Sequence, residues 1–321
     1  MIMNTKHKPL VSVIIPCYNA EKTLCETVQS VQRQSFTRWE IIIVNDGSTD
    51  SSAQLANQLA TQQCIQVIHT PNRGVSAARN LGEKIARGKY LAFLDADDIW
   101  HVNKLQTQVD FFNQNSKLGV CYSRVRFTSP SGKSLHQYSA IPKKPLTAYD
   151  LLVENHLCTS SNIMCLKQLF NESAGFDTSM NYAEDQEWLI RIALDDKWDI
   201  AGVAEVLMDY RTQTNSLSSS LDKMEQGWQT LTKKVAIYAP SFIVDHFHTA
   251  QAIYLRYLAR RALRQGDPAL IGLNYIKRAI KSDWQVFIIS PKRSFATLFA
   301  LLFWWCLPIP LTAQLLHINK Q

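Results

Sequence analysis

The stretch Lys89-Tyr-Leu-Ala-Phe-Leu-Asp-Ala-Asp-Asp-Ile-Trp100 decides how the rest of the chain is interpreted. Tyr90 to Leu94 is a short apolar run of strand length, typical of a strand buried inside a parallel sheet. It is followed at once by three carboxylates, Asp95, Asp97 and Asp98. Because unpaired buried charge is costly, we expect these acids where an open α/β sheet forms a ligand-binding crevice.

The three acids favour a metal site. If the strand continues, its alternation places Asp95 and Asp97 on one side, where both carboxylates can bind one hard cation. This pattern predicts a Mg²⁺ or Mn²⁺ site that also holds an anionic, phosphorylated ligand. The alternative interpretation is a solvated acidic turn.

Strand-like and helix-like segments alternate over the first hundred residues. We predict strands at 10–16, 39–45, 65–69 and 90–94, and helices at 21–34, 51–61 and 75–86. This order with short links is typical of a doubly wound, mostly parallel α/β sheet.

Polar residues follow every one of these predicted strands. They are Tyr18 and Asn19, then Asp46, then Asn72 and Arg73, then Asp95 and Asp97. Right-handed crossovers bring the carboxyl ends of parallel strands to one edge, so these side chains should line one crevice. The chain has no GxGxxG and no GxxxxGK[ST], which argues against a dinucleotide fingerprint and a P-loop.

The middle of the chain continues the α/β pattern. We predict helices at 102–115, 147–156 and 182–193, strands at 119–127 and 199–208, and a loop at 210–218. Glu184 and Asp185 fall at the start of the third of these helices. Their simpler interpretation is that they are first-turn acids, which the helix dipole stabilises.

The last hundred residues differ in character. Residues 222–281 have helical patterns, and Arg256, Arg260, Arg261 and Arg264 are spaced as on a solvated helix face. The formal net charge is +7, and most of the excess of Lys and Arg lies beyond residue 225. Charge alone does not choose between nucleic acid, anionic lipid and phosphate ligands. We expect no nucleic-acid partner.

An apolar stretch lies near the C-terminus, within 295–311. Residues 295–307 carry no charge, yet a membrane-spanning helix needs about 20 apolar residues. Lys292 and Arg293 precede the stretch, and Trp304 and Trp305 suit the headgroup region. We interpret it as an element resting peripherally on the cytoplasmic face of the membrane. The alternative is a buried core helix or a dimer contact.

Seven scattered cysteines show no CxxC pair and no zinc-type spacing with histidine. This pattern is typical of reduced thiols, so we expect a cytoplasmic protein.

With these residues identified, the first part of the chain resembles the family 2 glycosyltransferases, which have a GT-A fold. The resemblance lies in Val13-Ile-Ile-Pro-Cys-Tyr-Asn19, Ile43-Val-Asn-Asp-Gly-Ser-Thr-Asp50, Asn72-Arg-Gly-Val-Ser-Ala-Ala-Arg-Asn80, Phe93-Leu-Asp-Ala-Asp-Asp98, Gly175-Phe-Asp177, Glu184-Asp185 and Tyr210-Arg211. Each match is weak alone, but this many in this order is specific. The resemblance implies a catalytic domain at 1–220 and a helical region at 221–321.

The resemblance also implies roles for individual residues. Nucleotide-sugar binding falls to Pro16, Tyr18, Asn19, Asp46, Arg79, Asp95 and Glu184. Asp97 would bind the Mg²⁺ or Mn²⁺ ion, which stabilises a diphosphate leaving group. Asp185 would be the general base that takes the proton of the acceptor hydroxyl.

The expected reaction is inverting transfer from a nucleotide-diphosphate sugar, by family habit a UDP-sugar, to a saccharide or lipid-linked saccharide. Such a reaction belongs to cell-surface polysaccharide or glycolipid biosynthesis. Two positions depart from the family pattern: Asn45 replaces a frequent aspartate, and Gln213 a frequent histidine. They suggest a degenerate nucleotide-sugar-binding subunit as one alternative. A metal-dependent phosphatase is another, although such enzymes carry Asp-x-Asp after the first strand.

Overall fold

The structure is a computed structural model that describes residues 8–62, 64–180, 182–212 and 220–306. The described residues form two compact units. The first lies within 1–151 and 155–216, and the second within 152–154 and 217–321.

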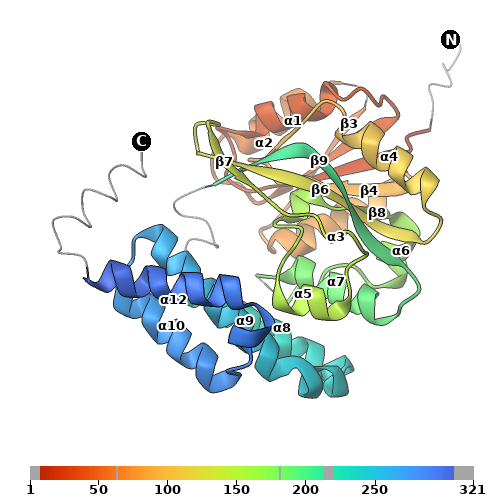
Figure 1. Cartoon of the computed structure of the whole chain (residues 1–321). Coiled ribbons are helices and arrows are strands. Elements are labelled where there is room, and N and C mark those ends of the chain that lie inside the picture. The colour runs from red at the N-terminus through yellow and green to blue at the C-terminus, as the bar shows by residue number, and fades with distance from the viewer. Residues whose placement is uncertain (1–7, 63, 181, 213–219, 307–321) are drawn as a thin grey trace, which may run out of the picture. The chain divides into compact units, whose positions relative to one another are not determined.

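The first unit is built on a sheet whose strands follow the order β3-β2-β1-β4-β8-β6-β9-β5, with β7 paired to β6 (Figure 1). The strands are β1 (Val11–Cys17), β2 (Trp39–Asp46), β3 (Ile65–Thr70), β4 (Tyr90–Phe93), β5 (Ile99–Trp100), β6 (Leu118–Thr128), β7 (Ser134–Tyr138), β8 (Met164–Leu166) and β9 (Asp199–Arg211). β1 to β4 run parallel, as predicted. β8 then pairs antiparallel to β4, and β6 runs parallel to β9.

Helices cover both faces of this sheet (Figure 1). They are α1 (Leu24–Gln32), α2 (Ser52–Leu59), α3 (Val75–Ile85), α4 (Lys104–Gln114), α5 (Ala148–Val153), the short 3₁₀ helix η1 (Ser160–Asn162), α6 (Lys167–Glu172) and α7 (Glu184–Leu194). Val13 and Ile15 of β1 share a buried core with residues of α1, α2 and α4. Ile14 faces the other way, against Gly82 of α3. The predicted α/β class, a sheet with helices on both faces followed by a helical region, is therefore confirmed.

The second unit is helical, as predicted for 222–281. Its helices are α8 (Leu221–Tyr238), α9 (Pro240–Gln265), α10 (Ala269–Ser282), α11 (Val286–Ile289) and α12 (Pro291–Cys306). Trp228 of α8 stacks on Tyr254 of α9, with ring centroids 5.1 Å apart. Leu301 of α12 is buried against Gly272 of α10, so one face of α12 belongs to the core.

Three sequence-based interpretations need correction. The fourth strand ends at Phe93, and Asp98 N donates to Asp95 O over 3.1 Å, so a turn replaces the alternation assumed for Asp95 and Asp97. Tyr210 and Arg211 belong to β9 and not to a loop.

The third correction concerns the arginine-rich face of α9. Arg256 is buried and donates to Ser294 Oγ over 2.8 Å, which removes it from the solvated face. Gln213 and the end of the apolar segment, 307–311, lie outside the described residues. Among the described helices, none is both long and apolar enough to cross a membrane.

Candidate active site

The carboxyl ends of β1 and β2 are tied together by Asn19. Its Oδ1 accepts from Thr49 N over 2.8 Å, and its own N–H donates to Ser48 Oγ over 3.1 Å. Asn19 has φ of 49°, a left-handed conformation that asparagine tolerates. Tyr18 beside it is 53% exposed, whereas Pro16 is buried in β1 next to Val44. The end of β1 therefore presents the exposed ring of Tyr18 on a turn that two hydrogen bonds of Asn19 hold in place.

Asp46 holds the loop that leads into α3. Its two carboxylate oxygens accept from Arg73 N and Gly74 N, each over 2.9 Å. The same loop lies close to Gly47, where an added Cβ would fall 2.6 Å from Asn72 N. Gly47 also has φ of +72°, so glycine is needed there. Asp46 therefore shapes the entrance to α3 through both of its oxygens.

Arg79 connects two acidic segments from the second turn of α3. Its side chain is 3% exposed; Nη2 lies 2.5 Å from Asp95 Oδ1 and Nη1 lies 2.7 Å from Glu184 Oε1. A buried guanidinium with two carboxylate partners remains charged, and its pKa is raised by both partners in spite of burial. Arg79 thus joins the end of β4 to the first turn of α7.

Asp95 is fixed by η1 on its other side. Its Oδ2 accepts from Thr159 Oγ1 over 3.2 Å, and its N–H donates to Ser161 Oγ over 2.9 Å. Trp100 Nε1 in turn donates to Ser161 O over 2.9 Å. These hydroxyl residues were missed in the sequence analysis. The run Cys158-Thr-Ser-Ser-Asn162 was the available signal, because four short polar side chains in sequence rarely form a regular element.

The acids that follow Asp95 differ in environment. Asp98 is fully buried; its Oδ1 accepts from Arg211 N over 3.0 Å, and its Oδ2 has no hydrogen-bond partner among the described residues. Burial, then the charges of Asp97 and Asp95, raise the pKa of Asp98 well above its ordinary value. Asp97 is half-buried in the turn between them.

Three crowded carboxylates suit a hard divalent cation. Proteins hold Mg²⁺ through one or two carboxylates together with substrate phosphates, so the acids at the end of β4 fit such an ion. Within the described ranges, however, no group of three or more His, Cys, Asp and Glu side chains is arranged to hold a metal ion.

Asp185 lies in the first turn of α7, beside Glu184. It is buried, and Gln186 N donates to its Oδ1 over 2.7 Å. Burial and then the charge of Glu184 raise the pKa of Asp185 to about 6, whereas Arg79 and a hydrogen bond from Asn155 act in the opposite direction. A carboxylate with this pKa is ionised at neutral pH yet basic enough to accept a proton.

Helix α3 contacts Asp46 at its N-terminus and the acidic residues Asp95 and Glu184 through Arg79. Asp46 binds its N-cap residue Gly74, and Arg79 of the same helix binds Asp95 and Glu184. Asp185 follows Glu184 directly. The structure therefore brings Arg79, Asp95, Glu184 and Asp185 into one cluster, while Pro16, Tyr18 and Asn19 form a separate group at the end of β1.

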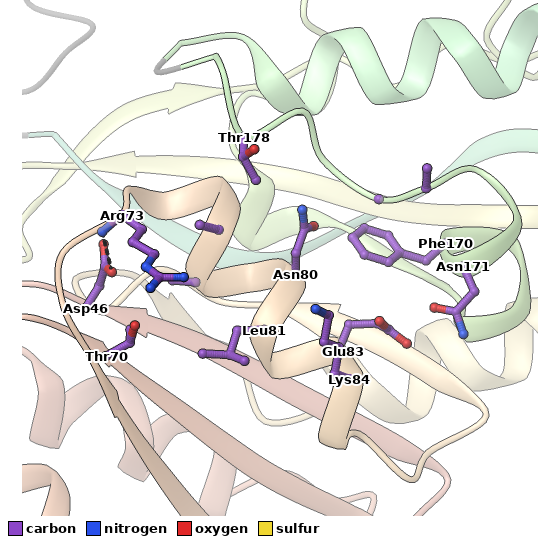
Figure 2. A pocket seen from close by; sticks show the side chains of 14 residues that line it. Asp46, Thr70, Arg73, Asn80, Leu81, Glu83, Lys84, Phe170, Asn171 and Thr178 are labelled. Atoms are coloured by element: carbon purple, nitrogen blue, oxygen red, sulfur yellow. Dashed lines mark hydrogen bonds between the residues drawn. The ribbon is translucent and has the colours of Figure 1, made fainter.

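A groove of about 490 Å³ runs along α3 (Figure 2). Of the predicted site residues it includes Asp46, but neither Asp95 nor Asp185. Figure 2 shows Arg73 beside Asp46 at one end, and Glu83 and Lys84 at the other. The groove therefore does not contain the acidic cluster.

Comparisons with known proteins identify the family. The model described as "Glycosyl transferase family 2" matches residues 12–173. TuaG of Bacillus subtilis (strain 168), named as a teichuronic acid biosynthesis glycosyltransferase, is 32% identical over 265 residues, covering 81% of this chain and 99% of TuaG. WfgD of Escherichia coli, named as a UDP-Glc:alpha-D-GlcNAc-diphosphoundecaprenol beta-1,3-glucosyltransferase, is 27% identical and covers 69% of this chain and 85% of its own.

A solved structure shares the fold. S. aureus TarS 1-349, crystallised in complex with UDP-GlcNAc, matches with a TM-score of 0.56 at 17% identity, covering 86% of this chain and 91% of that chain.

Proposed function

The chain belongs to glycosyltransferase family 2, and we propose that it is an inverting enzyme that moves a sugar from a UDP-sugar to a hydroxyl group of a lipid-linked saccharide. One observation carries this proposal. Arg79 binds Asp95 and Glu184 at once, which joins the acids assigned to the donor to Asp185, the acid assigned to the acceptor.

The donor side of the proposed site is formed by the ends of β1, β2 and β4. Tyr18 supplies an exposed ring for the base, and Asp46 holds the loop of Arg73 and Gly74 beside it. Pro16 and Asn19 fix this strand end. Asp95, oriented by Arg79, faces the ribose and diphosphate.

We assign the divalent cation to Asp97. Mg²⁺ or Mn²⁺ bound there would stabilise the negative charge on the leaving diphosphate. The neighbouring carboxylates Asp95 and Asp98 also favour binding of a cation, because a positive charge reduces the repulsion between them.

Asp185 is the proposed general base. As the acceptor oxygen attacks the anomeric carbon, Asp185 removes its proton, and the bond from that carbon to the diphosphate oxygen breaks. A single displacement inverts the anomeric configuration. The pKa of about 6 supports this role, since the carboxylate is ionised at neutral pH. The charge of Arg79 keeps Glu184 paired, so that Asp185 remains the available base.

The choice of donor and acceptor rests on the relatives. TarS was crystallised with UDP and with UDP-GlcNAc, and the name of WfgD specifies a UDP-glucose donor and a diphosphoundecaprenol-linked acceptor. TuaG is named for teichuronic acid biosynthesis. We therefore place the reaction in cell-surface polysaccharide synthesis, at the cytoplasmic face of a membrane. Catalysis is assigned to the first unit, close to the predicted domain 1–220.

A donor panel tests the proposal. Purified protein is incubated with Mn²⁺ and a series of UDP-, GDP- and dTDP-sugars, with and without lipid-linked acceptor, and the released nucleotide is measured. We expect release from one UDP-sugar, lost in Asp97→Ala and retained in Asp110→Ala, which removes an exposed acid of α4. If no nucleotide-sugar binds in the presence of metal, or if free phosphate is released from a phosphoester instead, the proposal fails.

A further inference from the structure

A second groove lies wholly within the helical unit, between α9 and α12. Its volume is about 290 Å³, and it is lined by Arg260, Leu263, Lys292, Arg293, Ala296, Thr297 and Ala300. Cationic side chains from both helices therefore line this groove together with apolar ones. No role in sugar transfer has been assigned to any of these residues.

The cations around this groove are crowded. Burial, then the charge of Arg260, lowers the pKa of Arg264, and burial, then the charge of Arg293, lowers the pKa of Arg256. Among the described residues, no acid forms an ion pair with Arg260, Arg264 or Lys292. Such repulsion opposes folding, and it is relieved when an anion binds.

The position of Lys292 in its helix is a further destabilising feature. Lys292 and Arg293 fall in the first turn of α12, where the helix dipole favours acids and disfavours cations. Arg293 approaches Glu154 at 3.5 Å, but both side chains are largely exposed, so this pair contributes little. This arrangement of charges therefore destabilises the folded helical unit. Binding of an anionic ligand would explain why it is present.

An apolar stripe runs beside the groove. Phe295, Phe299 and Phe303 recur every four residues on α12 and are 45%, 62% and 67% exposed. Ala296 and Ala300, each one residue further along, line the groove. One residue corresponds to a rotation of about 100° on an α-helix, so the stripe occupies the face next to the groove. Ser294 to Cys306 contains no charged residue. Large exposed aromatic surfaces of this kind mark interaction sites.

We propose that this groove and stripe bind a membrane surface that contains anionic phospholipid. The phosphate headgroup lies between Arg260, Lys292 and Arg293, and the phenylalanine stripe enters the boundary between headgroups and acyl chains. A basic groove next to an aromatic stripe complements both parts of such a lipid, whereas a soluble anion leaves the stripe uncovered. The inference rests on the proposed function, which places the reaction at a membrane, and it names the surface that binds that membrane.

The test is vesicle co-sedimentation of the full chain, without donor or acceptor, so that its failure is separate from any failure of sugar transfer. Vesicles contain phosphatidylcholine alone, or phosphatidylcholine and phosphatidylglycerol in equal amounts. We expect binding to the anionic vesicles, and about 30-fold weaker binding for the double variant Arg260→Gln with Lys292→Gln. Phe299→Ser should also weaken binding. Thermal melting checks that the variants are folded.

The matched control is Lys233→Gln with Lys277→Gln, which removes the same charge from exposed positions on α8 and α10. It should bind within about threefold of the wild type, since these lysines lie outside the groove. Equal binding to both kinds of vesicle, an equal loss in the control, or unchanged binding of Phe299→Ser would overturn the proposal. So would binding of inorganic pyrophosphate without any binding to vesicles.

Discussion

Arg79 Nη1 lies 2.7 Å from Glu184 Oε1, so that α3 is bonded directly to the first turn of α7. The same guanidinium holds Asp95 at the end of β4. A planar guanidinium reaches each acid with a different nitrogen, whereas a lysine has a single nitrogen for both. The predicted donor side and acceptor side of the site therefore depend on one residue.

Arg79→Lys should uncouple the two sides. We expect loss of about 2 kcal/mol of folding stability, because one buried carboxylate loses its partner, and about a 100-fold lower transfer rate from misplaced acids. Urea denaturation and nucleotide release measure the two effects. Arg87→Lys is the control: Arg87 also binds a buried acid, Glu40, over 2.8 Å, but pairs outside the cluster. Equal losses of activity in both variants would contradict the bridging role.

The pH profile should report the ionisation of Asp185. Burial raises the pKa of this carboxyl to about 6, so it becomes protonated as the pH falls below that value. The transfer rate should be level above pH 7 and fall about tenfold per unit below pH 6. Rates at saturating donor, with circular dichroism to confirm folding at each pH, provide the measurement. A constant rate down to pH 5 would exclude this group as the base.

Asp46→Asn should weaken nucleotide binding more than it slows transfer. Both oxygens of Asp46 accept backbone N–H groups, and the amide group of asparagine would place a donor against one of them. An unsatisfied buried group of this kind should lower UDP affinity about tenfold by loosening the Arg73 loop. Calorimetric titration with UDP measures it, with Asp110→Asn as the control. Unchanged affinity would show that the loop does not contribute to the donor site.

Lys104 should make folding stability increase with pH. Burial lowers the pKa of its ammonium group from 10.5 to about 7. Between these values the unfolded chain carries the proton and the folded chain does not, so stability rises by up to about 1.4 kcal/mol per pH unit. Urea denaturation at pH 7 and pH 8.5 should show this rise in wild type and in Lys84→Met, an exposed control. Lys104→Met should lack it; equal slopes would contradict the expectation.

The sequence was informative where its periodicity was strong. β1 to β4 are apolar runs separated by helical patterns, so their order and parallel arrangement were predictable. β8 was not, because Met164–Leu166 is too short to form a recognisable pattern and is defined by its pairing with β4. Arg256 was also misassigned, since helical spacing alone does not show which turn a neighbouring helix covers.

Within the site, the sequence located the acids but not their environments. The sequence alone does not distinguish Asp95, Asp97 and Asp98, yet Asp98 is buried while the other two are half-buried. The turn that follows Phe93 decides this difference, and it depends on the backbone bond between Asp98 and Asp95. The contacts of Thr159 and Ser161 with Asp95 span more than sixty positions of sequence. No local pattern could predict them.

The assignment of Asp185 as the general base is tested most directly by comparing two variants with the wild type. Asp185→Asn and the exposed-acid control Asp195→Asn are assayed for donor affinity and for the rate of transfer to a lipid-linked acceptor. We expect Asp185→Asn to bind donor within about twofold of wild type and to transfer at least about 100-fold more slowly, because only the proton acceptor is lost. Asp195→Asn should match wild type in both. Transfer by Asp185→Asn at the wild-type rate, with donor affinity intact, would contradict the assignment of Asp185 as the general base.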